Sequence, residues 1–177
     1  MPLIFRRLYY FCKTKIYKVT SASKIRLFLI TLIFTVILGS CNKENDVIPD
    51  VTVSFSISVK DPQFASLNAF GNAALVNKNT NNLGILAAGY DENGIIVFSW
   101  VDYEFYAYDR TCPHDYAVNG LSIPVNIDPS NSMNAICPEC GTNYSLSAGG
   151  TPSKGIGQYP LKNYRTSFSN PWIHVSN

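Results

Sequence analysis

The chain has 177 residues, which at the usual size of domains allows one domain and additional segments. Its formal net charge of +2 is unevenly distributed, because residues 1–40 carry seven of the 14 cations and no acid, whereas residues 41–177 carry all 12 acids. The larger part of the chain is therefore mildly acidic, and this excludes a cationic face of the kind that binds nucleic acid.

An apolar segment follows the cationic N-terminal stretch. Residues 27–38 contain no charge, and twelve residues suit the core of a signal peptide but are too few for a membrane-spanning helix, which needs about 20. The segment ends in Leu-Gly-Ser-Cys at 38–41, which resembles a bacterial lipobox. This resemblance implies cleavage before Cys41 and attachment of lipid to its thiol; a signal anchor with an incidental cysteine is the alternative.

We therefore expect a signal peptide over residues 1–40 and a lipidated cysteine with a polar tether over residues 41–50. The polar residues 42–46 are similar to the segment that follows the lipidated cysteine in surface lipoproteins of the Bacteroidetes, although a simple spacer is an equally good interpretation. The expected location is the bacterial cell envelope, at the outer membrane, facing the periplasm or the outside, with the lipid on Cys41 as the membrane contact.

Beyond residue 50 the sequence is typical of β-structure. Residues 51–59 alternate apolar and polar side chains without a break, which predicts a strand with one buried face. Asn119-Gly120 is expected to be a turn between strands, and no segment shows a helical period of useful length. Residues 51–177 are therefore predicted to form an all-β domain. Further short strands are expected within residues 63–82 and at 84–89, 95–101, 103–109, 121–127, 133–136, 143–146, 159–164 and 172–175.

Two short motifs contain most of the soft metal-binding side chains. One is Cys-Pro-His at residues 112–114, and the other is Cys-Pro-Glu-Cys-Gly at residues 137–141, with 22 residues between His114 and Cys137. Proline fixes the entry to a turn and glycine permits a left-handed exit. Three thiolates and one imidazole suit tetrahedral zinc or an iron–sulfur cluster, whereas Mg²⁺ and Ca²⁺ prefer oxygen ligands.

The cysteine count favours a metal over a disulfide framework. Of the five cysteines, Cys12 lies in the leader and Cys41 would carry lipid, so three remain for the domain. An odd number does not complete a set of disulfides in an oxidising compartment. Three interpretations stay open: an iron–sulfur cluster, a zinc ion, or no metal, the last with Cys137 and Cys140 as a free or oxidised pair.

The sequence around both motifs resembles the Rieske-type [2Fe–2S] domain family over roughly residues 85–175. Residues 105–114 match the strand that leads into the family's Cys-x-His motif, and residues 137–144 match its Cys-x-x-His-Gly-Ser-x-Tyr/Phe motif except at one ligand. A Gly-rich turn at 149–152 and Pro160-Leu161 follow in the family's order. The resemblance implies an antiparallel β sandwich or barrel with a cluster-binding subdomain of two loops.

The same resemblance implies a role for each residue of the motifs. Cys112 and Cys137 would hold one iron, and His114 and Cys140 the other. Cys140 replaces the family's second histidine; this thiolate lowers the reduction potential relative to a two-histidine centre and leaves His114 as the only ligand able to couple a proton to the electron.

The resemblance also implies two residues that would contact the cluster without being its ligands, and both follow the second motif in the chain. Thr142 occupies the position of a hydroxyl donor to a cluster sulfide, and Tyr144 that of a phenol donor to a cysteine sulfur. Either residue could equally be a half-buried strand residue. His174 near the C-terminus is expected to be an ordinary strand residue and not a ligand.

Two functions follow from these alternatives. The first is electron transfer by a membrane-anchored lipoprotein with a [2Fe–2S] cluster on Cys112, His114, Cys137 and Cys140, serving an unidentified redox partner protein. The second is a structural or binding module with zinc, for which three cysteines and one histidine are an ordinary ligand set, or with no metal. The chain contains no candidate Ser/His/Asp set and no phosphate loop, so no catalytic residues are assigned.

Overall fold

The computed structural model describes residues 47–177. The predicted signal peptide, Cys41 and the first part of the predicted tether lie outside the described residues. Within residues 47–177 no helix combines the length and the apolarity that crossing a membrane requires. The last residues of the predicted tether are described: Ile48 is buried and its carbonyl accepts a hydrogen bond from Lys162 Nζ at 2.9 Å. Lys162 also forms an ion pair with Asp50, so residues 48–50 are fastened to the C-terminal part of the domain.

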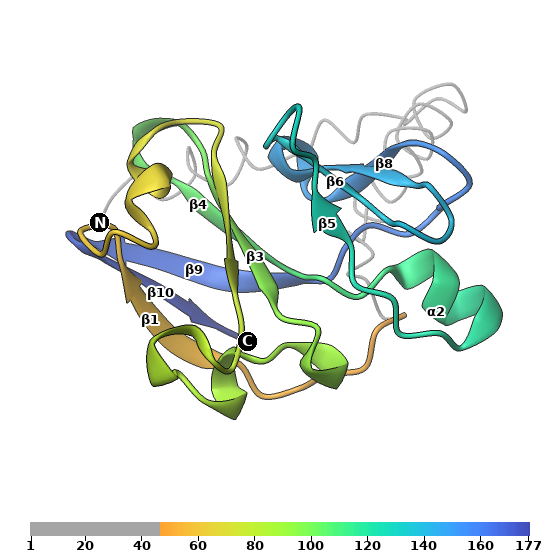
Figure 1. Cartoon of the computed structure of the whole chain (residues 1–177), viewed down its shortest axis with the longest axis horizontal. Helices are drawn as coiled ribbons and strands as arrows, with labels where there is room; N and C mark the ends of the chain where they lie inside the picture. The colour runs from red at the N-terminus through yellow and green to blue at the C-terminus, as the bar shows by residue number, and fades with distance from the viewer. Residues whose placement is uncertain (1–46) are drawn as a thin grey trace, which may run out of the picture. The chain divides into compact units, whose positions relative to one another are not determined.

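The described chain forms two antiparallel sheets, a six-stranded sheet in the order β1-β10-β9-β4-β3-β2 and a four-stranded sheet in the order β5-β6-β7-β8. Figure 1 shows β9 running along the larger sheet and β5, β6 and β8 together in the smaller one. The strands are β1 (Ser54–Ser58), β2 (Ala73–Val76), β3 (Ile95–Ser99), β4 (Phe105–Asp109), β5 (Asn126–Ile127), β6 (Asn134–Ile136), β7 (Asn143–Ser145), β8 (Thr151–Lys154), β9 (Asn163–Ser169) and β10 (Trp172–Ser176).

The side-chain pattern of each strand follows from what covers its faces. In β1, Phe55 and Ile57 are buried while their neighbours are not, which confirms the strand predicted from the alternation at residues 51–59. All five residues of β3 are buried. Its Ile95 and Val97 belong to a core inside the six-stranded sheet, whereas Ile96 and Phe98 belong to a second core. A strand covered on both faces has no polar side, so β3 shows an uninterrupted apolar run.

The second core joins the two sheets. It combines Tyr108 of β4 with Ala135 of β6, Tyr144 of β7 and Leu146, and it also contains Cys112 and Cys137. The two motif cysteines are thus built into the packed interior between the sheets, and their positions are fixed by the packing of the domain.

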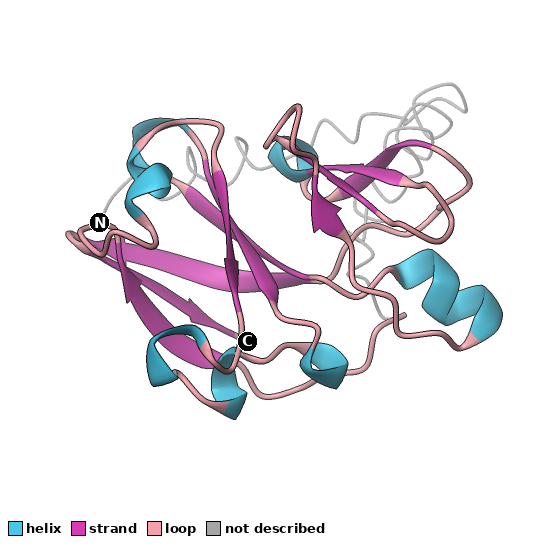
Figure 2. Ribbon diagram, viewed as in Figure 1, coloured by secondary structure: helices cyan, strands magenta, loops and turns pink. Residues whose placement is uncertain are grey.

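The prediction of a largely β domain of antiparallel sheets is confirmed, but the absence of helix is wrong. Residues Pro113–Asn119 form the α-helix α2, visible in cyan in Figure 2. Proline stands in its first turn, and Gly120 ends it with left-handed backbone at φ 67°. Asn119-Gly120 is therefore a helix end and not a turn between strands. Seven residues are too few to show a helical period in the sequence.

The strands predicted at 84–89, 121–127 and 159–164 are also wrong in extent or type; of the last, residues 163–164 alone lie in β9. Residues 84–89 contain a short 3-10 turn, Ile85–Ala87, because the glycines on either side adopt positive φ and Ile85 is exposed. The strand expected at 121–127 is reduced to β5, since α2 and the segment after it occupy the path from the first motif. Short 3-10 turns also occur at Ala65–Asn68, Thr80–Asn82, Tyr90–Glu92, Val101–Tyr103 and Leu146–Ala148.

Candidate metal centre

The first motif is positioned by a hydrogen-bonded junction at the end of β4. The buried carboxylate of Asp109 accepts hydrogen bonds from the backbone N–H of Thr111 at 2.8 Å, from the N–H of Tyr90 at 2.7 Å and from the hydroxyl of Tyr164 at 2.7 Å. One residue further on, the backbone N–H of Cys112 donates to the carbonyl of Ile123 at 2.8 Å. The chain is thus held on both sides just before Cys112 becomes the N-cap residue of α2.

The second motif is a tight loop between β6 and β7. The N–H of Cys137 donates to the carbonyl of Thr142 at 3.0 Å, and the N–H of Gly141 donates to the carbonyl of Cys137 at 3.1 Å. Gly141 has φ 68°, a left-handed conformation that favours glycine. This loop therefore presents Cys137 and Cys140 on one side of the turn, as its glycine and proline predict.

The two motifs meet. One ligand atom from each of Cys112, Asp115, Cys137 and Cys140 lies within 4.8 Å of all the others. Cys112 Sγ and Cys140 Sγ are 3.7 Å apart, and Cys137 Sγ lies 2.9 Å from Asp115 Oδ2. Cys112 and Cys137 are 0% exposed, Asp115 is 1% exposed, and Cys140 is half-buried. The convergence of the three cysteines, predicted from two motifs more than 20 residues apart, is present in the structure.

His114 is not part of this group, and Asp115 is. His114 is half-buried and occupies the second position of α2, whereas Asp115 follows it and is buried. Sequence reasoning missed Asp115 because it took residues 112–114 as a loop tip. The available signal was an acidic residue in the first turn after Cys-Pro, but without the helix nothing indicated which side chain would face the sulfurs.

The two residues predicted to contact the cluster do lie against cysteine sulfurs. Thr142 Oγ1 is 3.2 Å from Cys140 Sγ and accepts a hydrogen bond from the N–H of Gly157 at 2.9 Å. The hydroxyl of Tyr144 is 3.3 Å from Cys112 Sγ. Both side chains are fully buried. Their hydroxyls can donate to a thiolate once the cysteines lose their protons, and hydrogen bonds of this kind orient ligands and tune a metal centre.

The electrostatics of the group favour a cation. A hydrogen bond from Cys137, helped by the hydroxyl of Tyr144, lowers the pKa of the Cys112 thiol to about 7. The contact with Cys112, together with burial, raises the pKa of Cys137, and burial raises that of Cys140. Burial alone would raise the pKa of Asp115, but hydrogen bonds from the thiols, that of Cys137 first, lower it. A carboxylate and a readily ionised thiol are thus buried side by side, and metal binding would displace the remaining thiol protons.

The donor set fits a metal centre in two ways. In a tetrahedral zinc site with Zn–S bonds of about 2.3 Å, two sulfurs lie about 3.8 Å apart, close to the 3.7 Å between Cys112 and Cys140. A [2Fe–2S] cluster takes four terminal ligands, and Cys112, Cys137 and Cys140 would supply three of them. Three thiols suit either metal by their chemistry.

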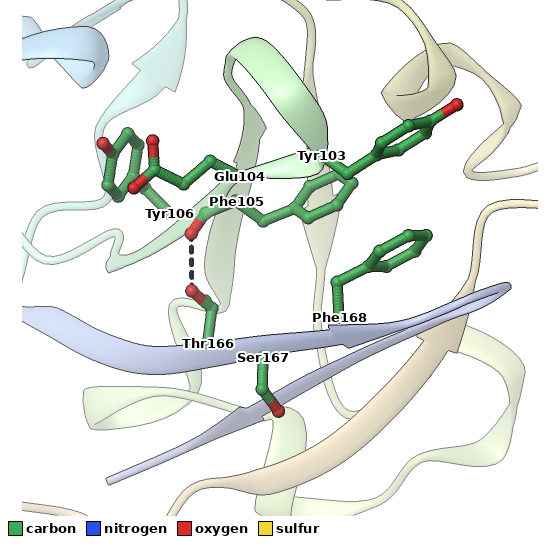
Figure 3. Close-up of a pocket in the computed structure, with 7 residues that line it drawn as sticks. All are labelled: Tyr103, Glu104, Phe105, Tyr106, Thr166, Ser167 and Phe168. Carbon is green, nitrogen blue, oxygen red and sulfur yellow. Dashed lines mark hydrogen bonds between the residues drawn. The ribbon is translucent and has the colours of Figure 1, made fainter.

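A pocket of about 270 Å³ lies elsewhere, between β4 and β9. Figure 3 shows the rings of Tyr103, Phe105 and Phe168 at one end of it and the Thr166 hydroxyl donating to the carbonyl of Phe105. Tyr103 and Phe168 stack with ring planes 2° apart. Glu104 is the one carboxylate in its lining, which also contains the hydroxyls of Thr166 and Ser167.

Among the comparisons with known proteins, the search of solved structures found similar proteins. No family model matches the chain, and no curated protein matches it. The plasma membrane Rieske protein PetC3 from Synechocystis PCC 6803 is 19% identical with a TM-score of 0.45, over 72% of this chain and 100% of that one. The ferredoxin of carbazole 1,9a-dioxygenase from Nocardioides aromaticivorans IC177 is 13% identical with a TM-score of 0.41, over 71% and 97%.

The Sphingomonas yanoikuyae B1 ferredoxin is 15% identical with a TM-score of 0.41, over 63% of this chain and 93% of that one. Identities and TM-scores of this size do not establish a family. The chain is therefore assigned by its own geometry: a mostly β protein with two antiparallel sheets and a buried group of three cysteines and one aspartate, of the kind that binds metal.

Proposed function

We propose that this protein is a Rieske-like electron carrier whose [2Fe–2S] cluster is held by Cys112, Cys137 and Cys140 together with one further ligand. The observation that carries the proposal is the meeting of three sulfurs from two separate loops in one buried group within 4.8 Å. When bound, such a cluster exchanges one electron at a time with a partner.

The side chains around the sulfurs support a redox role. Thr142 and Tyr144 place hydroxyls 3.2–3.3 Å from two of the three sulfurs, and hydrogen bonds to cluster ligands set the reduction potential. Packing of Cys112 and Cys137 into the core between the sheets excludes water from one side of the site. Cys140 is half-buried and supplies the side at which a partner protein can approach for electron transfer.

We further propose that lipid on Cys41 anchors this carrier to the bacterial cell envelope, where its redox partner is also located. Support comes from the Leu-Gly-Ser-Cys sequence at 38–41 and from the uncharged segment before it. Expression of the full chain in a bacterium with a lipoprotein pathway should give a membrane-associated, lipid-labelled product. Cys41→Ser should abolish the label and should not alter metal content; a wild-type product that takes no lipid label would refute the anchoring.

The second candidate function is structural binding of one zinc ion. It is favoured by the compactness of the group, whose sulfur separation of 3.7 Å matches one edge of a tetrahedral site. In this case the ion would fasten the start of α2 to the loop between β6 and β7, and the protein would serve as a binding or structural module without a redox role.

Metal and sulfide analysis of the mature protein, prepared without air, separates the two candidates. An electron carrier should be brown, contain about two irons and two sulfides per chain, and give an EPR signal after reduction with dithionite. A colourless protein with one zinc per chain would overturn electron transfer and support the structural role. A protein that binds neither metal would overturn both.

A further inference from the structure

We propose that Asp115, and not His114, supplies the fourth protein ligand of this centre, as one carboxylate oxygen beside three cysteine sulfurs. The inference rests on the proposed metal centre and goes beyond it, because the sequence predicted the imidazole of His114 as the fourth ligand and the proposed function leaves that ligand open. It applies to the iron–sulfur cluster and to the single zinc ion.

The first argument is geometric. Asp115 Oδ2 lies 2.9 Å from Cys137 Sγ and within 4.8 Å of the donor atoms of Cys112 and Cys140, whereas the imidazole of His114 is not in this group. Consecutive residues of an α-helix point about 100° apart around its axis. His114 and Asp115 are consecutive in α2 and therefore point in different directions, and the one that faces the sulfurs is Asp115.

The second argument concerns the charge of Asp115. A buried carboxylate is costly unless a cation or several strong donors accompany it. Asp115 is 1% exposed, and the two ion pairs found among residues 47–177, Lys78 with Glu92 and Lys162 with Asp50, do not involve it. Its side-chain oxygen instead faces the thiol of Cys137.

Metal binding increases the negative charge around Asp115. Thiols release their protons when they bind a metal, so the group would then contain three thiolates around a buried carboxylate. Four negative charges at such distances are strongly disfavoured, and direct contact of the carboxylate with the cation removes the repulsion. A carboxylate oxygen is an ordinary ligand for zinc, at about 2.0–2.2 Å, and Asp115 Oδ2 already lies among the three sulfurs.

The test compares Asp115→Asn with His114→Gln in protein loaded and purified without air, both variants keeping the size of the original side chain. Metal content is measured for each variant. The reduced iron protein is examined by pulsed EPR for coupling to an imidazole nitrogen, and a zinc protein is examined by X-ray absorption for the multiple scattering that an imidazole ligand produces and a carboxylate does not. Asp115→Cys, which replaces one anionic ligand by another, is the rescue variant.

We expect His114→Gln to keep the wild-type metal content and spectrum, with no imidazole nitrogen coupling in either protein. Asp115→Asn should lose metal affinity by at least tenfold, and Asp115→Cys should restore binding. Imidazole coupling that disappears in His114→Gln, or full metal retention by Asp115→Asn, would overturn the ligand assignment while leaving the metal centre in place. A wild-type protein without any metal would overturn the proposed function itself, so the two failures are distinguishable.

Discussion

Asp109 gathers three donors onto one buried carboxylate directly before the first motif. It accepts from the N–H groups of Tyr90 and Thr111 and from the hydroxyl of Tyr164. Asp109→Ala should lower the free energy of unfolding by roughly 3–5 kcal/mol, because each buried donor left without an acceptor costs about 1–3 kcal/mol and entering water recovers part of it. Urea unfolding followed by fluorescence measures the change.

The matched control for Asp109→Ala is Tyr164→Phe, which removes one of the three donors and leaves the carboxylate with the other two. Its expected cost is about 1–2 kcal/mol. If both variants lost the same free energy of unfolding, the junction would not act as a shared acceptor, and the position of the first motif would depend on packing instead.

Cys140 is the residue whose replacement tests the iron–sulfur assignment through the reduction potential. In the iron–sulfur protein, Cys140→His replaces an anionic ligand by a neutral one, which favours the reduced state. The variant should keep its cluster and show a higher reduction potential than the wild type, measured by redox titration with EPR detection. A lower or unchanged potential in a variant that still holds the cluster would show that Cys140 is not a ligand.

At the scale of single residues the sequence predicted which three sulfurs meet but not the complete group. Cys112, Cys137 and Cys140 could be found because cysteine next to proline and glycine at fixed spacing has few other uses. Asp115 could not be found, since an acid in the first turn of a helix usually faces solvent and complements the helix dipole. Its role depends on which side of α2 faces the second loop, and this is decided by packing between the sheets.

Among the elements, the turn before β8 offers a controlled test of packing against backbone strain. Gly149 and Gly150 have nearly the same backbone, with φ 70° and 68°. A Cβ on Gly149 would meet open space, whereas one on Gly150 would lie 3.0 Å from Leu161 Cβ and 3.1 Å from the ring of Tyr108. Gly149→Ala should cost about 1 kcal/mol for the left-handed conformation. Gly150→Ala should cost about 1–3 kcal/mol more, for the added overpacking.

Thermal unfolding of the two glycine variants reads out this difference directly. If Gly150→Ala were no less stable than Gly149→Ala, the turn would have room to shift away from Tyr108. The contact of this turn with the core between the sheets would then be loose.

The elements that could be predicted are those in which buried and exposed side chains follow a regular pattern along the sequence. The alternation at residues 51–59 predicted β1 because one face of that strand is buried throughout. The strand predicted at 84–89 is wrong because glycines at both ends bend the segment into a 3-10 turn. An apolar run of that length does not distinguish a strand from a turn. The helix α2 was missed because it is ended by a glycine after only seven residues.

The whole domain depends on contacts that cross between its sheets. Tyr108 of β4 is fully buried, and its hydroxyl donates to the carbonyl of Leu146, beyond β7, at 2.7 Å. Within the larger sheet, Tyr164 of β9 is buried as well and donates to Asp109 of β4. Such links between segments distant in the sequence were not predictable, because any of the eleven tyrosines could have served as a packing residue or as a donor.

These two phenols, together with the buried phenol of Tyr144, make the stability of the molecule depend on pH. Burial, with smaller effects from Tyr106, raises the pKa of Tyr108 above its ordinary value of 10.0, and burial followed by Asp109 raises that of Tyr164. The unfolded chain therefore loses these protons from about pH 10 upward, while the folded chain keeps them. The resulting stabilisation is complete below pH 10 and is lost as the pH rises toward the folded-state values, because the unfolded state binds fewer protons there.

Above pH 10 the free energy of unfolding should accordingly fall by about 1.4 kcal/mol per pH unit for each buried phenol whose pKa is raised, and Tyr144 contributes beside Tyr108 and Tyr164. Urea unfolding at several pH values between 9 and about 11.5 measures the slope, and absorbance near 295 nm shows whether phenolate appears together with unfolding. In Tyr164→Phe one of these contributions is gone, so the slope should decrease by about 1.4 kcal/mol per pH unit although the variant is less stable at neutral pH. Equal slopes for both proteins would mean that Tyr164 ionises in the folded state, which its burial against the carboxylate of Asp109 opposes.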